Sequence, residues 1–153
     1  MRYAGNAVNM AYTERIIVVG SGQVGVVAAT RVAHRFGPVD LIGEVDATGL
    51  GEIGVRVYRN VRVKSVDLDT PALIVHKDSG RTQRLVCDRL VIADDDVHAE
   101  LPRGMWVHGG KVVVLGGEHH AELLDECFAA HAGWRNALAD YQWRRQAEAD
   151  QLA

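Results

Sequence analysis

The chain has 153 residues, about the length of one domain. Its 48% hydrophobic and 24% charged residues and its mean hydropathy of -0.05 are typical of a globular protein, which excludes a mainly disordered chain. No apolar run approaches the roughly 20 residues that a membrane-spanning helix requires, and a net charge of -3 without a basic stripe argues against nucleic acid as the main partner.

The cysteines and the two ends of the chain set further expectations. Cys87 and Cys127 are far apart in the sequence and form no redox motif, so we expect two reduced, buried thiols in a cytoplasmic protein. The start of the chain lacks the apolar core of a signal peptide. We expect a disordered extension over 1–13, a single domain over 14–143, and the end of a helix with a tail over 144–153. Arginine far outnumbers lysine, which indicates a high-GC genome, that of a bacterium or its phage.

The first part of the domain reads as strand, glycine turn, helix and strand. The β-branched run Ile16–Val19 predicts a strand buried on both faces, as in a parallel sheet. Glycines follow it, residues 26–36 have helical composition, and Gly37-Pro38 ends that helix. Residues 39–42 predict the second strand.

The second part combines half-exposed strands with two more buried ones. Residues 47–54 predict a loop with one helical turn, and the alternation over 55–58, 61–68 and 73–77 predicts half-exposed strands. Residues 82–86 would close an antiparallel meander. The runs 90–93 and 111–115 predict buried strands, and one long helix is expected from about 118 to about 149. Its apolar face would comprise Leu124, Cys127, Phe128, His131, Trp134, Leu138 and Tyr141.

The turn after the first strand fits the pattern G-x-G-x-x-G, as Gly20-Ser21-Gly22-Gln23-Val24-Gly25. The first glycine permits a tight turn, the second lets the backbone approach a pyrophosphate, and the third lets helix and strand pack closely. Amide groups at the helix N-terminus would then face the anion. A tight strand-to-helix turn without a ligand is the alternative interpretation.

Over most of residues 15–140 the chain resembles the FAD/NAD(P)-binding domains of flavoproteins with two dinucleotide-binding domains. The resemblance rests on the opening run 15–22, the meander before the strand at 90–93, and Val112–Gly117 followed by a helix. It implies a Rossmann-like α/β fold: a parallel sheet with helices on one side, a three-stranded meander on the other, and a long C-terminal helix. It also implies cofactor contacts at the glycine turn, at Glu44, and at Gly116 and Gly117.

Three positions depart from this family. The acidic residue that ends the second strand and holds the ribose arrives one position late, as Glu44 after Gly43, and Asp94-Asp95 replace a Thr-Gly pair. Gly117 stands where flavin-binding members have an aspartate. We therefore expect NAD(P) or another adenine dinucleotide and no tightly bound FAD.

The length leaves room for one such domain and for no separate substrate domain. The sequence thus predicts an accessory subunit of an oxidoreductase, with no catalytic residue of its own. Any catalysis would be hydride transfer with a partner subunit.

Two polar clusters could hold a metal ion, but neither is assigned one. His119 and Glu122 could share a helical face, yet two ligands make no zinc site and solvated polar residues are the favoured interpretation. Asp94-Asp95-Asp96 could bind Mg²⁺, whereas a strand-end turn or helix cap is favoured.

Three aromatic residues on the C-terminal helix predict association. Trp134 is easily explained as a core residue, whereas Tyr141 and Trp143 would meet another chain, as a homo-oligomer or with a partner protein.

Other functions on related folds remain open. The main rival is a noncatalytic interaction or regulatory module that binds no dinucleotide. A nucleotide-sensing domain of the potassium-uptake type would leave the meander unexplained, and a methyltransferase would have an acidic residue where Val18-Val19 stand.

Overall fold

A computed structural model describes residues 14–152, without the side chain of His98, so the extension predicted over 1–13 lies outside the described residues. A six-stranded sheet has the order β3-β2-β1-β7-β9-β8. Its parallel members are β1 (Ile16–Val19), β2 (Val39–Ile42), β3 (Val55–Tyr58), β7 (Arg89–Ile92) and β9 (Val112–Val114), and β8 (Val107–His108) runs antiparallel to β9. This is the strand order of the Rossmann fold.

The central register aligns Val18 with Leu41 on one side and with Val91 on the other. The four strands predicted to form one parallel sheet are confirmed. β3 adds a fifth parallel strand at the edge of the sheet. Its sequence alternates apolar and polar residues because an edge strand is less completely covered than a central one.

Alternate residues of the strands enter two separate hydrophobic cores. Ile16 and Val18 pack with the helices, whereas Ile17 and Val19 pack with Leu73 and Val75 of the meander. The parallel strands are buried on both faces, which is why they read as continuous apolar runs.

The helical layer consists of α2 (Gly22–Phe36), α4 (Glu118–Ala130) and α5 (Trp134–Leu152). The prediction of one helix from about 118 to about 149 is wrong: His131 has extended backbone (φ -131, ψ 144), and α5 starts after Gly133. The apolar residues of the predicted face nevertheless reach the core, except the half-buried His131.

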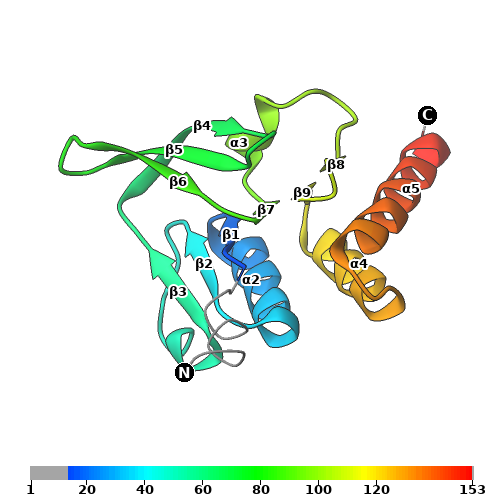
Figure 1. Ribbon diagram of the computed structural model, residues 1–153, viewed down its shortest axis with the longest axis horizontal. Coiled ribbons are helices and arrows are strands. Elements are labelled where there is room, and N and C mark those ends of the chain that lie inside the picture. Colours follow the sequence, from blue (N-terminus) through cyan, green and yellow to red (C-terminus); the bar gives the residue numbers. More distant parts are fainter. Residues whose placement is uncertain (1–13, 153) are drawn as a thin grey trace, which may run out of the picture.

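The other layer is the three-stranded antiparallel sheet of β4 (Val61–Asp67), β5 (Ala72–Lys77) and β6 (Thr82–Val86). In Figure 1 it lies at the top, away from α4 and α5 at the right. The short helices η1 (Gly51–Ile53) and α3 (Asp95–Ala99) complete the order. The meander and the turn at 51–53 agree with the expectations from the sequence.

Two side chains of α5 form hydrogen bonds to one backbone carbonyl of the sheet. Val114 O accepts hydrogen bonds from Tyr141 Oη at 2.8 Å and from Arg145 Nη1 at 3.1 Å. Tyr141 is therefore fully buried inside its own chain, which corrects its predicted place on a partner face. Trp143 is 71% exposed. No helix within residues 14–152 is long and apolar enough to cross a bilayer.

Candidate functional site

The glycine turn is held by close backbone packing among three glycines. Gly20 N donates to Ile42 O at 3.0 Å, and a Cβ on Gly25 would stand 2.4 Å from Gly20 O. A Cβ on Gly43 would stand 2.1 Å from the same oxygen. The structural roles expected of Gly20 and Gly25 are met, and Gly43 is a further requirement.

The sequence pattern does not single out Gly43 as a site residue, because Gly43 enters it only as the residue that moves Glu44 one position beyond the end of the second strand. The available signal is a glycine directly after the second strand, where that strand passes the turn of a G-x-G-x-x-G motif. Such a residue lets β2 approach the turn at backbone distance.

Gly22 faces open space at the start of α2. Its φ is +73°, and a Cβ there would meet no heavy atom within 4 Å. Ser21, at the N-cap, makes no side-chain capping bond, and the first turn of α2 has no acidic residue. Gln23 is exposed and Val24 is half-buried. The positive end of the helix dipole is thus open to an anionic group.

A cavity of about 430 Å³ adjoins this turn at the carboxyl ends of β1 and β2. This volume lies within the range of small-molecule pockets, and the carboxyl edge is where open α/β sheets bind ligands. Its walls come from the glycine turn, β4 and the α3 region: Val19, Ser21, Ile42, Gly43, Glu44, Val61, Arg62, Val63, Lys64, Asp94, Asp96, Val97 and Glu100.

Glu44 lines the cavity but already has backbone and side-chain partners. Its carboxylate accepts a hydrogen bond from Asn60 N at 2.6 Å, and its own N–H donates to Ser21 Oγ at 3.2 Å. Arg59 lies 4.0 Å from the carboxylate. Glu44 thus holds the turn between β3 and β4 against the glycine turn.

In the acidic run Asp94-Asp95-Asp96 after β7, one residue has a structural role. Asp94 Oδ1 accepts a hydrogen bond from Val97 N at 3.0 Å and so caps α3, as favoured from the sequence. Asp96 also lines the cavity, while Asp95 is exposed outside its lining.

The second glycine turn lies outside this cavity. Gly116 N donates to His120 Nδ1 at 2.9 Å, and Gly117 precedes α4 at its N-cap. The structure therefore does not place Gly116 and Gly117 in the wall shared by Ser21 and Glu44.

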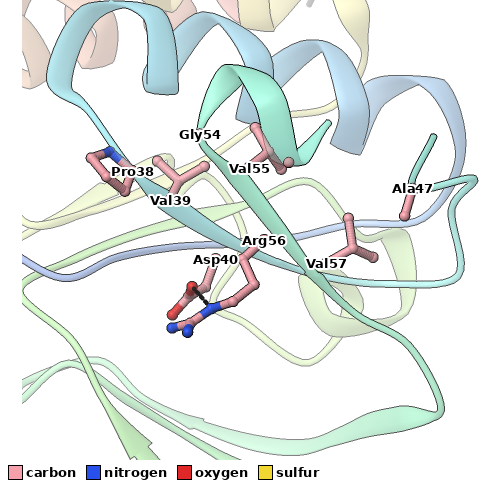
Figure 2. A pocket seen from close by; sticks show the side chains of 9 residues that line it. Pro38, Val39, Asp40, Ala47, Gly54, Val55, Arg56 and Val57 are labelled. Carbon is pink, nitrogen blue, oxygen red and sulfur yellow. Dashed lines mark hydrogen bonds and ion pairs between the residues drawn. The ribbon is translucent and has the colours of Figure 1, made fainter. Parts of the chain in front are cut away.

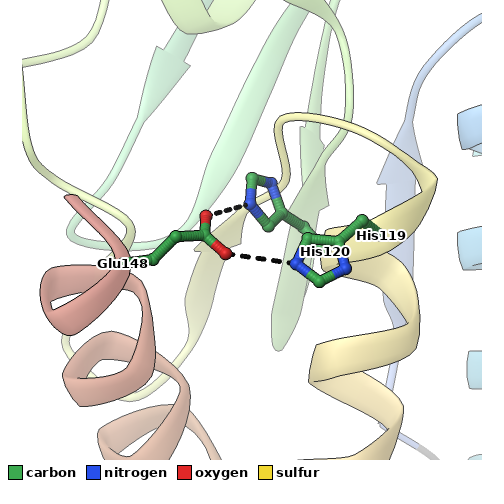
Figure 3. Close-up of side chains that lie close together, drawn as sticks. All are labelled: His119, His120 and Glu148. Carbon is green, nitrogen blue, oxygen red and sulfur yellow. Dashed lines mark hydrogen bonds and ion pairs between the residues drawn. The ribbon is translucent and has the colours of Figure 1, made fainter. Parts of the chain in front are cut away.

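His119, His120 and Glu148 form a separate polar cluster between α4 and α5 (Figure 3). Glu148 lies 3.1 Å from His119 Nε2 and 2.9 Å from His120 Nε2. Their ligand atoms all lie within 4.8 Å of one another. Glu122, which the sequence places on the same helical face as His119 without assigning a metal, instead lies 3.7 Å from Arg31.

The hydrogen bonds of His120 favour a structural role for the cluster. Because Nδ1 accepts the Gly116 N–H, neutral His120 carries its proton on Nε2 and donates it to Glu148. A metal on Nε2 would need the opposite tautomer, whose Nδ1–H would face the Gly116 N–H. Burial lowers the pKa of His120, and the two histidines lower the pKa of Glu148.

A hollow of about 640 Å³ lies at the opposite edge of the sheet, near the amino ends of β2 and β3, and Figure 2 shows the side chains that line it. Its charged groups already satisfy each other: Asp40 is paired with Arg56 and with Arg15, each at 3.1 Å. It also lies away from the carboxyl ends of the parallel strands, so we assign it no ligand.

Neither cysteine offers a reactive thiolate. Burial raises the pKa of Cys87 to about 12 and that of Cys127 to about 11. Both are free and buried, as expected from the sequence, so thiol chemistry has no nucleophile here.

Solved structures share part of this fold. A pyridine nucleotide-disulfide family oxidoreductase from Enterococcus faecalis V583 is 17% identical with a TM-score of 0.48, over 52% of this chain and 22% of that one. The water-forming NADH oxidase of Lactobacillus brevis, bound to NADH, is 18% identical with a TM-score of 0.46, over 53% and 25%. An engineered water-forming NADPH oxidase bound to NADPH is 17% identical with a TM-score of 0.45, over 75% and 32%.

No protein-family model and no curated protein matches the sequence. The chain spans between a fifth and a third of the length of those oxidoreductases. Its strand order and the glycine turn between its first strand and first helix establish a Rossmann-like fold.

Proposed function

We propose that this chain binds a dinucleotide, NAD(P) or another adenine dinucleotide, at the turn formed by Gly20 to Gly25. The observation that carries the proposal is Gly22, which leaves open space at the uncapped N-terminus of α2. A pyrophosphate fits such a place because backbone N–H groups and the helix dipole both favour an anion. A nicotinamide ring, when bound, supplies the hydride chemistry, and the residues of this chain hold and orient it.

We further propose that the chain is a cytoplasmic accessory subunit that associates with itself or with a partner. Two buried free thiols suit a reducing compartment. The exposed Trp143 offers an aromatic contact of the kind enriched at protein interfaces.

Thermal unfolding with added ligand tests the binding site. NAD(H), NADP(H) or an adenine nucleotide should raise the melting temperature of the wild type, because a ligand that binds the folded state stabilises it. Gly22→Asp should abolish the shift, since it places a carboxylate where the phosphate would lie. Gly49→Asp is the matched control, because Gly49 also has positive φ (+79°) and open surroundings.

Titration calorimetry decides against the proposal if no heat is measured with any of these ligands or with FAD at millimolar concentration. We expect no flavin in the protein as purified, because Gly117 and Asp94-Asp95 replace two contacts of flavin-binding domains. A yellow preparation with stoichiometric FAD would overturn that expectation.

A noncatalytic interaction module that binds no dinucleotide is the second candidate. It is favoured by the bond between Glu44 and Asn60 N, which occupies the carboxylate expected to hold a ribose. Asp94, Asp96 and Glu100 also line the cavity and would repel an anion. A negative titration with a fully folded protein would select this candidate.

A further inference from the structure

The strand β4 contributes four residues, 61–64, to the lining of the 430 Å³ cavity that adjoins the glycine turn. Its pairing with β5 aligns Val63 with Val75 and then Ser65 with Ile74, so Lys64 is an extra residue in a β-bulge. The bulge shifts the alternation of the strand: Val61 and Val63 pack on the core before it, and Val66 after it. Bulges re-aim side chains and are frequent beside binding sites.

Arg62 and Lys64 are exposed side chains of this lining. Within residues 14–152 neither makes an ion pair or a side-chain hydrogen bond. Most of the other described arginines do make ion pairs, namely Arg15, Arg31, Arg35, Arg56, Arg59, Arg84, Arg89 and Arg144. The two cations beside the glycine turn are therefore available to a ligand.

Carboxylates of the α3 region line the same cavity, and within residues 14–152 they form no ion pair with these cations. Asp96 and Glu100, on and after α3, border the same cavity, and within the described part of the chain they have no ion-pair partner either. Opposite charges thus face one cavity and stay apart. A ligand with phosphate groups toward β4 and hydroxyl groups toward α3 would satisfy both sets of charges, because carboxylates accept hydroxyl hydrogen bonds.

A second hollow of about 340 Å³ adjoins the first at Glu44, Val61 and Arg62, which line both. Lys77 and His76 also line it. Lys77 thus adds a third cation next to Arg62, although the carboxylates of Glu44 and Asp78 border the same hollow, and the hollow gives an extended ligand room past Arg62.

From this arrangement we infer that Arg62 and Lys64 bind phosphate groups of the ligand whose pyrophosphate lies at the glycine turn. The inference rests on the proposed dinucleotide function. The meander is then the second half of the binding site rather than only a cover for the sheet. The two cations could bind either a phosphate of the pyrophosphate or a phosphate on the ribose.

The test compares the double variant Arg62→Gln, Lys64→Gln with the wild type by titration calorimetry with NAD⁺, NADP⁺ and inorganic pyrophosphate. Glutamine keeps most of the length of each side chain and removes the charge. The matched control is Arg81→Gln with Lys111→Gln, which changes net charge equally at exposed positions outside both cavities.

We expect the dissociation constant of the double variant to rise about tenfold or more, with the control unchanged. Affinity of the wild type should fall as salt is raised, and that of the double variant should fall less, since fewer charge contacts are screened. A loss confined to NADP⁺ would place the contact on the ribose phosphate, whereas equal losses for all three probes would place it on the pyrophosphate.

Two results would overturn the inference and are distinguishable. If the wild type binds and the double variant binds equally well, or if the control is weakened as much, Arg62 and Lys64 hold no phosphate while the proposed function stands. If the wild type binds none of the probes, the dinucleotide function itself fails.

Discussion

Gly43 sets how closely β2 can approach the glycine turn. Its backbone N donates to Tyr58 O at 3.2 Å, and the Gly20 carbonyl occupies the space of any side chain there. The turn therefore needs a glycine outside the G-x-G-x-x-G pattern, since the first strand, the second strand and the helix all meet at Gly20.

Gly43→Ala should destabilise the fold by about 3 kcal/mol or more, because its Cβ would lie 2.1 Å from Gly20 O and backbone would have to move. Gly51→Ala is the control, since a Cβ there meets nothing within 4 Å and its φ is not in the left-handed region. We expect the control to change the free energy of unfolding by less than about 1 kcal/mol. Urea denaturation measures both, and a Gly43→Ala protein as stable as the control would contradict the packing.

At the scale of elements, α4 and α5 meet through polar groups at one end and aromatic groups at the other. His120 and Glu148 join them near the β9 turn, while Phe128 lies 4.7 Å from the Trp134 ring and Phe36 lies 5.3 Å from it. The polar end depends on pH, and the aromatic end does not.

His120 makes stability depend on pH below its ordinary pKa of 6.5. Burial lowers its pKa in the folded state, and Glu148, Arg145 and His119 are the charged groups around it. Below pH 6.5 the unfolded chain therefore binds a proton at His120 more readily than the folded chain does. The contribution of neutral His120 to the free energy of unfolding is thus complete above pH 6.5 and is lost as pH falls through the lowered pKa. Protonation of Nδ1 would also break the bond from Gly116 N.

His120→Asn should flatten the dependence of the urea midpoint on pH between 7.5 and about 5. The amide oxygen lies near the position of Nδ1 and can still accept from Gly116 N, but it does not titrate. His119→Asn, at a mostly exposed side chain, should leave the wild-type dependence in place. Identical pH profiles for wild type and His120→Asn would exclude this role.

The two tryptophans of α5 should separate folding from association. Trp134 is buried against two phenylalanines, so Trp134→Ala should reduce the free energy of unfolding by about 3–5 kcal/mol. Trp143 is 71% exposed, so Trp143→Ala should leave the monomer folded and weaken any self-association. Light scattering and denaturation of both variants measure these effects, and a wild type that stays monomeric at high concentration would remove the association through Trp143.

Strands and helix faces were predictable where local pattern decides them. The apolar runs at β1, β2, β7 and β9 identify buried parallel strands, because both faces of each are covered. The break between α4 and α5 was not predictable, because His131 continues the helical spacing of the apolar residues. Its extended backbone arises only in the folded chain, where His131 Nε2 lies 3.0 Å from Asp140. Tyr141 was misplaced for a related reason: the sequence shows no acceptor for its hydroxyl, which is Val114 O on a distant strand.

For the whole molecule, the candidate site is built from segments that only the fold brings together. The glycine turn was predictable because its residues are consecutive and lie between a strand and a helix. The contribution of β4 was not predictable, because Arg62 and Lys64 look like the solvated face of a half-exposed strand until the fold brings them into one cavity with Ser21.

The carbonyl of Val114 also divides α5 into two parts that should exchange their amide hydrogens at different rates. Residues 134–145 are tied to β9 through Tyr141 and Arg145, so their amides should exchange as slowly as those of the central strands, through global unfolding. Beyond Arg145 the two outward-reaching bonds, from His119 and His120 to Glu148, join α4 rather than the sheet. In deuterium oxide, the last turn of α5 should therefore exchange first by local fraying, and acidification should extend that fast exchange back toward Arg145.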